Sequence, residues 1–315
     1  MSQDDTPAAA QATPGAGRGA WPSEEVTDGR WTSRLLVLAA AMLFSTGGAA
    51  IKACSLTAWQ VASFRSAVAA LALLLFLPRT RRSLSPRAAL VGVAYAATVI
   101  LFVRANKLTT AANAIFLQST APLYLLLLAP WLLRERITRR DLAFMLVFLI
   151  GLGLIASATV STSATAPDPA SGNRLALVSG VAWALTLAGL RWLGKGAGAA
   201  ASLAAVVSGN LLAALVALGP ALPVQRVSMT DLAILVYLGV IQLALAYVLL
   251  TKAMRHVPAF EVSLLVLIEP VLNPIWVWLL QGEKTGVPAL VGGALILAAT
   301  GFRTWIDARS ANAAP

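Results

Sequence analysis

Glu269 has the clearest chemical potential of any residue in the chain. It is an acid near the middle of an apolar stretch, 258–280, and it directly precedes Pro270. A carboxylate inside a membrane is unfavourable unless it faces water, pairs with a cation or carries a proton. Two interpretations stay open. Glu269 either binds a substrate or a proton, or it forms hydrogen bonds with backbone groups that the proline leaves unpaired.

Asn273 and Trp276 follow Glu269 by four and seven residues. On a helix, residues at these offsets share one face. A carboxylate, an amide and an indole on one face would form the wall of a binding pocket. The alternative is a helix–helix interface in which the amide of Asn273 supplies the hydrogen bonds.

A second group of polar residues lies in the apolar stretch 110–133. Asn113, Thr120 and Tyr124 are offset by seven and eleven residues, which predicts one face of a helix. Gln118 would lie on a different side of that helix, and it comes shortly before Pro122. We expect Asn113 and Gln118 to contribute to substrate binding.

Pro122 and Pro270 lie near the middle of their apolar stretches. Proline interrupts helical hydrogen bonding, and bent membrane helices lend backbone groups to a cavity. We therefore assign both prolines a structural role. Arg65, seven residues into its own apolar stretch, is also expected to be structural. The remaining site candidates are polar or aromatic residues in other stretches: Trp183, Tyr247, Tyr95 and Gln242.

The composition explains which elements position these residues. The chain has 315 residues, of which 58% are hydrophobic and 12% charged, and its mean hydropathy is +0.78. Soluble domains carry about 25% charged residues, so this chain could not cover itself with a water-compatible surface. We predict an all-α membrane protein of ten transmembrane helices at 35–51, 59–77, 88–103, 110–133, 142–158, 175–193, 199–219, 231–251, 258–280 and 287–305.

The polar segments divide these ten spans into two groups of five. Residues 1–33 contain no apolar run of seven or more, so they are expected to be a disordered cytoplasmic tail and not a signal peptide. Residues 34–158 would hold spans 1–5, and 159–174 would form a linker rich in Ser, Thr, Ala and Pro. Residues 175–306 would hold spans 6–10, before a cytoplasmic tail at 307–315.

The distribution of basic residues predicts the orientation. Of the 24 Lys and Arg residues, 17 lie on the side of the N-terminus, 6 on the opposite side and one, Arg65, inside a span. Basic residues are enriched in cytoplasmic loops. Both termini are therefore expected in the cytoplasm, with the protein in the inner (cytoplasmic) membrane.

The two halves also resemble each other in sequence. At an offset of 148, Pro122 falls on Pro270 and Glu135 falls on Glu283, and we assign both acids a structural role. An odd number of spans in each half means that the two copies are inverted in the membrane, a common arrangement in transporters. The alternative is a chance similarity between two proline-bearing helices.

A weaker match supports the same division. At an offset of 139, Phe44 falls on Trp183 and Lys52 falls on Arg191. The pattern predicts that spans 1–5 and 6–10 superpose after rotation about an axis in the membrane plane.

Several functional classes lack the residues they need. Cys54 is the only cysteine and His256 the only histidine, so the chain has neither an internal disulfide nor a zinc site built from these residues. No phosphate-binding loop or nucleophile motif occurs. The basic residues follow membrane topology rather than a nucleic-acid surface. We predict no enzyme activity, no catalytic residues, no cofactor, no metal and no nucleic-acid partner.

The motifs resemble those of the drug/metabolite transporter superfamily, in its ten-helix EamA branch, over about residues 35–305. The matching segments are 44–52, Arg65, the run from Pro122 to Arg136, 183–191 and the run from Glu269 to Lys284. Two departures are Arg134 where the family has glycine and Phe44 where it has tryptophan. The resemblance implies a central cavity between the halves, lined mainly by helices 1, 3, 4, 6, 8 and 9, and no nucleotide-binding domain.

The resemblance further implies a secondary transporter that works by alternating access. We expect it to move a small metabolite, such as an amino acid or related compound, in the direction of export. One alternative is multidrug or cation efflux by the same fold, and another is a non-transporting membrane scaffold or membrane enzyme. A carboxylate within the membrane is compatible with proton coupling. Its substrate, direction, energy source and oligomeric state stay open.

Overall fold

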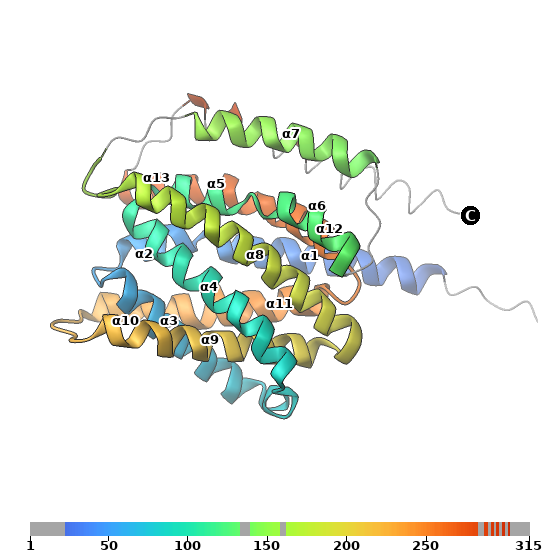
Figure 1. Cartoon of the computed structure of the whole chain (residues 1–315), viewed down its shortest axis with the longest axis horizontal. Coiled ribbons are helices and arrows are strands. Elements are labelled where there is room, and N and C mark those ends of the chain that lie inside the picture. Colours follow the sequence, from blue (N-terminus) through green and yellow to red (C-terminus); the bar gives the residue numbers. More distant parts are fainter. Residues whose placement is uncertain are drawn as a thin grey trace, which may run out of the picture.

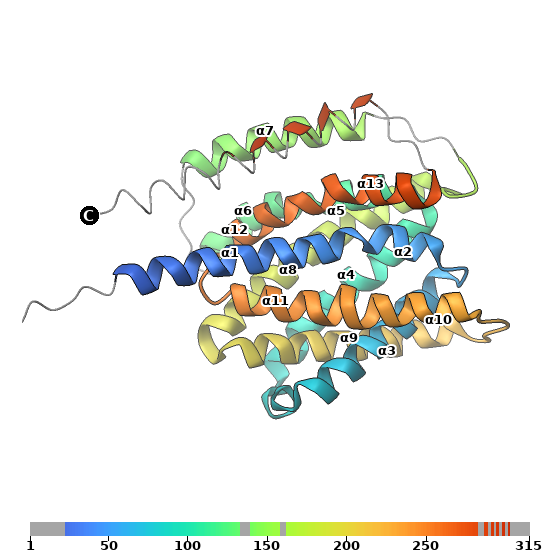
Figure 2. The same cartoon turned by 180° about the vertical axis from the view of Figure 1, so that it is seen from behind.

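The computed structural model describes residues 23–132, 139–157 and 162–282, together with single residues and pairs between 287 and 302. Within these residues the regular structure is helical, apart from one isolated bridge between Ser163 and Ala166. The expected all-α class is confirmed. Figures 1 and 2 show a bundle of long helices that lie side by side.

Where the structure describes it, the first half contains eight helical segments. They are α1 (Ser23–Ser45), α2 (Gly47–Ala53), α3 (Ala58–Phe76), η1 (Pro78–Ser83), α4 (Pro86–Leu108), α5 (Ala111–Gln118), α6 (Ala121–Leu132) and α7 (Arg139–Ala156). Local sequence explains several of their starts. Thr57 and Gln60 form a capping box at the start of α3, and the hydroxyl of Ser85 caps α4 just before Pro86.

The second half contributes eight more within the described part. They are α8 (Pro169–Ala197), α9 (Ala199–Ala221), α10 (Met229–Val236), the π-helical segment η2 (Tyr237–Leu245), α11 (Ala246–Ala253), α12 (Ala259–Leu265), the short 3₁₀ turn η3 (Val266–Ile268) and α13 (Glu269–Gln281). The segments α10, η2 and α11 follow one another directly, and so do α12, η3 and α13. Each run forms one span.

Seven helical stretches of the described part are long and apolar enough to cross a membrane: Trp31–Ala53, Ala58–Phe76, Pro86–Leu108, Pro169–Ala197, Ala199–Ala221, Met229–Ala253 and Ala259–Gln281. They correspond to expected spans 1, 2, 3, 6, 7, 8 and 9. The core of the fifth is the shorter apolar helix Leu142–Leu154. The tenth, 287–305, lies largely outside the described residues.

The fourth span departs from the expected continuous helix. It is divided into α5 and α6 by a break at Ser119 and Thr120, shortly before Pro122. Span 9 has its own irregularity, η3, directly before Pro270. Proline lacks the N–H that would continue the helix, which explains both interruptions. The helix predicted to carry Asn113, Thr120 and Tyr124 on one face is therefore interrupted. Asn113 and Thr120 nevertheless both lie against α8, beside Asn173 and Gly180 respectively.

Corresponding spans of the two halves run in opposite directions. Gln60, at the start of α3, donates from Nε2 to the carbonyl of Ala221 at the end of α9, at 3.0 Å. Ser63 donates to the carbonyl of Ala214 at 2.8 Å. In spans 4 and 9, α5 contacts α13 while α6 contacts α12. Antiparallel contacts between equivalent helices are the arrangement that inverted repeats require.

Two basic residues make equivalent contacts in the two halves. The ammonium of Lys52 donates to the carbonyl of Thr109, which ends α4, at 2.9 Å. The guanidinium of Arg191 donates to the carbonyl of Met254, which ends α11. Cations are favourable beside the carbonyls that end a helix. The weaker sequence offset thus corresponds to a matching pair of helix-end contacts.

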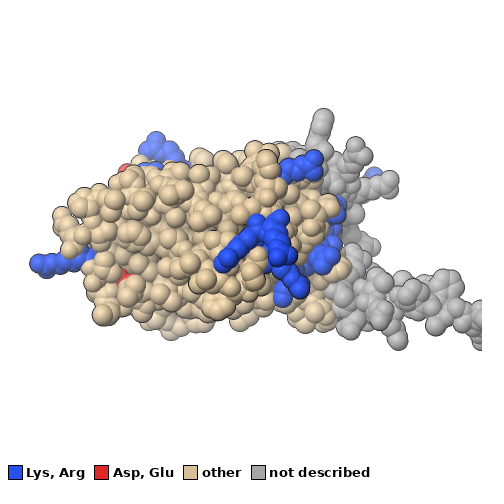
Figure 3. All heavy atoms as spheres, turned by 90° about the horizontal axis from the view of Figure 1, so that it is seen from below, with Lys and Arg blue, Asp and Glu red and all other residues tan. Residues whose placement is uncertain are grey.

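The bundle has two ends, because successive spans alternate in direction. We call the end where α1 begins the Arg34 end and the end where α2 stops the Lys52 end. On the face in Figure 3, Lys and Arg gather toward one end, and a broad band between the ends lacks them. Large exposed apolar side chains suit a surface that faces lipid: Leu71, Leu75, Phe76, Leu90, Leu146, Leu215, Trp278 and Leu280.

Candidate functional site

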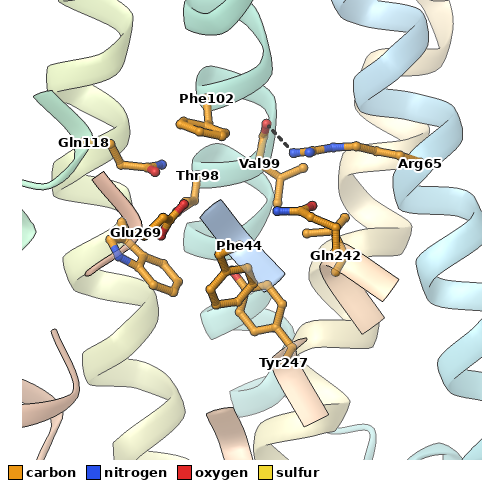
Figure 4. A pocket seen from close by; sticks show the side chains of 11 residues that line it. Phe44, Arg65, Thr98, Val99, Phe102, Gln118, Gln242, Tyr247 and Glu269 are labelled. Atoms are coloured by element: carbon orange, nitrogen blue, oxygen red, sulfur yellow. Dashed lines mark hydrogen bonds between the residues drawn. The ribbon is translucent and has the colours of Figure 1, made fainter. Parts of the chain in front are cut away.

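A partly open cavity lies within the bundle. Its walls come from both halves of the chain, as the close-up in Figure 4 shows. The first half provides Phe44, Arg65, Thr98, Val99, Phe102 and Gln118, and the second provides Trp183, Gln242, Leu243, Tyr247 and Glu269. These residues belong to spans 1, 3, 4, 6, 8 and 9 and, through Arg65, also to span 2.

Among the described residues, Glu269 is the only acid that lines the cavity. It is the first residue of α13, directly after the 3₁₀ turn η3, and its exposed fraction is 7%. A carboxylate is favourable in the first turn of a helix. Among the described residues, Glu269 forms no hydrogen bond or ion pair to another side chain or to the backbone beside Pro270. Its carboxylate is therefore available to a group inside the cavity.

Arg65 lies in the middle of α3, and its exposed fraction is only 1%. Its Nη2 donates to the carbonyl of Val99 at 3.5 Å, the limit of a hydrogen bond. Nε and Nη1 are buried and have no partner in the described part. Figure 4 shows the guanidinium reaching toward Val99 at the cavity wall. We expected a structural residue, and the structure places this one in the cavity lining.

An aromatic cluster forms another wall. Phe44 packs edge-to-face against Trp183 and Tyr247, with ring centroids 6.2 and 5.0 Å apart, and Trp183 and Tyr247 lie 6.1 Å apart. Edge-to-face packing is favourable for aromatic rings. Phe44 and Trp183 are equivalent at the offset of 139, so each contacts its own counterpart. Equivalent residues can touch only near the axis that relates the two halves, which puts the cavity on that axis.

Amide side chains complete the polar lining. Gln118 Nε2 donates to Ser179 Oγ at 2.7 Å, and that hydroxyl donates to the carbonyl of Thr98 at 3.2 Å. Gln242 lies in the π-helical segment η2, and its Oε1 is buried without a partner in the described chain. Single π-helical turns are frequent at functional sites, because they change the direction of the side chains that follow.

Three predicted site residues lie elsewhere. Asn273 is fully buried against Gly48, where an added Cβ would approach its Nδ2 to 2.5 Å. Trp276 donates from Nε1 to Ser45 Oγ at 3.0 Å. Both side chains thus lie against span 1. The amide of Asn273 is buried there without a hydrogen-bond partner in the described chain, so it does not supply the hydrogen bonds of the interface interpretation. Asn113 lies at the Lys52 end, where its backbone N–H is capped by the hydroxyl of Thr110.

The structure therefore brings together Glu269, Gln118, Trp183 and Tyr247 in one cavity. Sequence reasoning did not single out Thr98, Val99, Phe102 or Leu243. Thr98 and Phe102 are four residues apart, which is helical spacing, but one hydroxyl in an apolar span is a weak signal. Pro122 and Pro270 lie in the first turns of α6 and α13. Glu135 and Glu283 fall outside the described residues.

Comparison with known proteins matches this architecture. The EamA-like transporter family matches the chain twice in succession, over residues 31–157 and 170–304. A solved structure titled "Crystal structure of protein" has a TM-score of 0.68 and 18% sequence identity, and the alignment covers 87% of this chain and 98% of that one. That likeness shows a shared fold. A search of curated proteins finds no match. The two family matches together cover most of the chain, and the protein belongs to the EamA-like transporter family.

Proposed function

We propose that this protein is a secondary transporter that exports a small metabolite, such as an amino acid or related compound, across the cytoplasmic membrane. The observation that carries the proposal is the cavity on the axis between two inverted halves, with walls from both. When one half rocks against the other, a site in that position opens first to one side of the membrane and then to the other.

The chemistry of the cavity favours a small organic solute. Ligand sites typically have mainly apolar walls and a few placed polar groups. Glu269 supplies a negative charge, and the amides of Gln118 and Gln242 supply hydrogen-bonding groups. The faces of Phe44 and Trp183 suit the apolar part of a solute or a cation.

We further propose that both termini are cytoplasmic and that protons drive export. The excess of basic residues on the side of the N-terminus supports the orientation. Glu269 is the group that would exchange a proton with the cavity. The repeats are proposed to occupy 34–158 and 175–306, with 159–174 as an external linker. Reporter fusions in 79–87 and 162–173 should report opposite sides of the membrane.

The second candidate function is efflux of cationic drugs. The aromatic cluster beside a carboxylate favours it, because aromatic faces and a negative charge both attract cations. The two candidates differ in the solute and not in the mechanism. A carrier for cations would need no anion-binding group in its cavity.

The test is transport by the purified protein in proteoliposomes. Uptake and efflux of the twenty amino acids and a set of cationic drugs are measured with and without an imposed pH gradient. We expect saturable transport of at least one amino acid, driven by the gradient, and no transport in empty liposomes. Transport of the cationic drugs alone would favour the second candidate. If no solute moves faster than in empty liposomes, the proposal fails.

A further inference from the structure

The cavity contains two charged residues of opposite sign. Glu269 comes from span 9 in the second half, and Arg65 comes from span 2 in the first. No ion pair joins them, and the ion pair found among the described residues is the one between Arg34 and Glu261. Figure 4 shows the two side chains on different sides of the cavity. Each charge is therefore available to a separate group on a solute.

The guanidinium of Arg65 lacks the partners that its burial requires. It has five N–H donors in a planar fork, yet one weak contact, to the carbonyl of Val99, is made in the described part. A buried charge without a partner is strongly unfavourable. A carboxylate fits the fork with two parallel hydrogen bonds, which a lysine ammonium could not match. The missing partner is thus best supplied by an anionic group in the cavity.

The other half of the protein indicates that the fold does not require this arginine. The antiparallel counterpart of α3 is α9, which runs from Ala199 to Ala221 and contains no charged residue. Glu269 has an uncharged counterpart too, because the offset of 148 places Ala121 before Pro122. Both charges occur in one copy only, and both line the cavity.

We infer that the transported solute is a zwitterion, whose carboxylate binds Arg65 and whose ammonium binds Glu269. Gln242 also lines the cavity, on the side of Arg65, and its buried Oε1 has no partner in the described chain (Figure 4). The aromatic cluster of Phe44, Trp183 and Tyr247 contacts the solute's side chain. This inference rests on the proposed function and narrows its substrate class to compounds that carry both charges.

The test compares three solutes that share one carbon skeleton. L-phenylalanine carries both charges, phenethylamine lacks the carboxylate and 3-phenylpropanoate lacks the ammonium. L-leucine, isopentylamine and 4-methylpentanoate form a second set, so that the result does not depend on one side chain. Binding is measured by calorimetry in detergent and transport in proteoliposomes. We expect at least one amino acid to bind about 10- to 100-fold more tightly than its amine and its acid.

The variant Arg65→Gln separates a binding role from a structural one. It should reduce the affinity for the amino acid to that for the amine, while the affinity for the amine stays unchanged. Glu269→Gln should reduce the affinity for the amino acid to that for the acid, while the affinity for the acid stays unchanged. If Arg65→Gln does not fold, as judged by size-exclusion chromatography, Arg65→Lys provides the test. That variant keeps the charge but loses the fork, so the preference for the amino acid should fall at least several-fold.

Two results would overturn the inference and leave the proposed function standing. One is transport of the amines with an affinity equal to that of the amino acids in the wild type. The other is an equal loss of affinity for amino acid and amine in Arg65→Gln or Arg65→Lys. If no solute of either set or of the wider amino-acid panel is bound or transported, the proposed function fails and the inference fails with it.

Discussion

Pro122 and Pro270 occupy equivalent places in the two halves, but different residues precede them. Ala121 precedes the first proline and Glu269 the second. The helix is interrupted shortly before each proline, so the interruption does not need a carboxylate. The comparison separates two kinds of residue. Residues that occur in both halves of the chain are explained by the fold. Residues that occur in one half only need an explanation other than the fold.

The two ends of the bundle show the same difference in charge. At the Arg34 end, Arg34 Nε donates to Glu261 Oε1 at 2.7 Å, and both side chains are largely buried. The offsets of 139 and 148 equate these residues with Asn173 and Asn113. At the Lys52 end these two asparagines lie 3.5 Å apart, from Nδ2 to Oδ1. The Arg34 end thus carries an ion pair, and the Lys52 end has a weak contact between amides at the equivalent place, where Asn173 Oδ1 also accepts from Thr109 Oγ1 at 2.9 Å.

The largest expected effect concerns the difference between Ala121 and Glu269. Glu269→Gln should leave the protein inserted and folded, because the amide keeps the shape of the side chain. Transport should fall about 10- to 100-fold or lose its dependence on pH, since a charged hydrogen-bond acceptor is removed from the cavity. The initial rate of transport in proteoliposomes at several pH values measures the effect, and size-exclusion chromatography checks folding.

The matched control is Glu261→Gln, the same substitution eight residues earlier in the same span. Glu261 does not line the cavity, so this variant should keep the dependence of transport on pH that Glu269→Gln loses. If Glu269 instead repairs the backbone beside Pro270, Glu269→Gln should transport normally and Glu269→Leu should express poorly. If well-folded Glu269→Gln transports at the wild-type rate and with the wild-type pH profile, Glu269 has no role in transport.

The sequence predicted the features that depend on local chemistry. Apolar stretches located the spans, because the thickness of the bilayer sets their length. Pro122 and Pro270 located the irregularities of spans 4 and 9, because a missing N–H acts within one turn. Span 1 was predicted at 35–51 but begins at Trp31. Arg34 can lie inside it because Glu261, a residue distant in sequence, neutralises its charge.

The cavity lining could be predicted only in part, because it depends on how each helix is rotated and how closely its neighbours approach. Spacing placed Asn273 on the same face as Glu269, but Gly48 lets span 1 approach until that amide is covered. For Arg65, the sequence gives its depth in the membrane but not the direction of its side chain. Gln242 reaches the cavity from a π-helical segment, which no periodicity in the sequence indicates.

A smaller effect is expected from the ion pair at the Arg34 end. Glu261→Gln removes the negative charge and leaves the guanidinium of Arg34 facing a neutral amide. The change should weaken closure of this end by on the order of 1 kcal/mol, which is about a five-fold shift in a two-state equilibrium. The reporter is Ser263→Cys, a buried position in α12. Its rate of modification by a thiol reagent should rise about five-fold in Glu261→Gln.

The charge-reversed pair Arg34→Glu with Glu261→Arg provides the control for that result, since it restores an ion pair and should restore slow modification. Native Cys54 is buried, so the protein without the reporter gives the background rate. Equal modification rates in the wild type, Glu261→Gln and the reversed pair would show that the ion pair does not hold this end closed.

The smallest effect is expected at the equivalent contact of the Lys52 end. Asn113→Ala removes an amide contact of 3.5 Å, which is at the limit of hydrogen-bond geometry. The rate of transport and the rate of thiol modification of Ser263→Cys should each change less than about two-fold. The double variant Asn113→Glu with Asn173→Arg copies the ion pair to this end. It should slow transport, because both ends would then resist opening. If Asn113→Ala instead raises the modification rate as much as Glu261→Gln does, the two ends are equivalent and the contrast between them has no functional meaning.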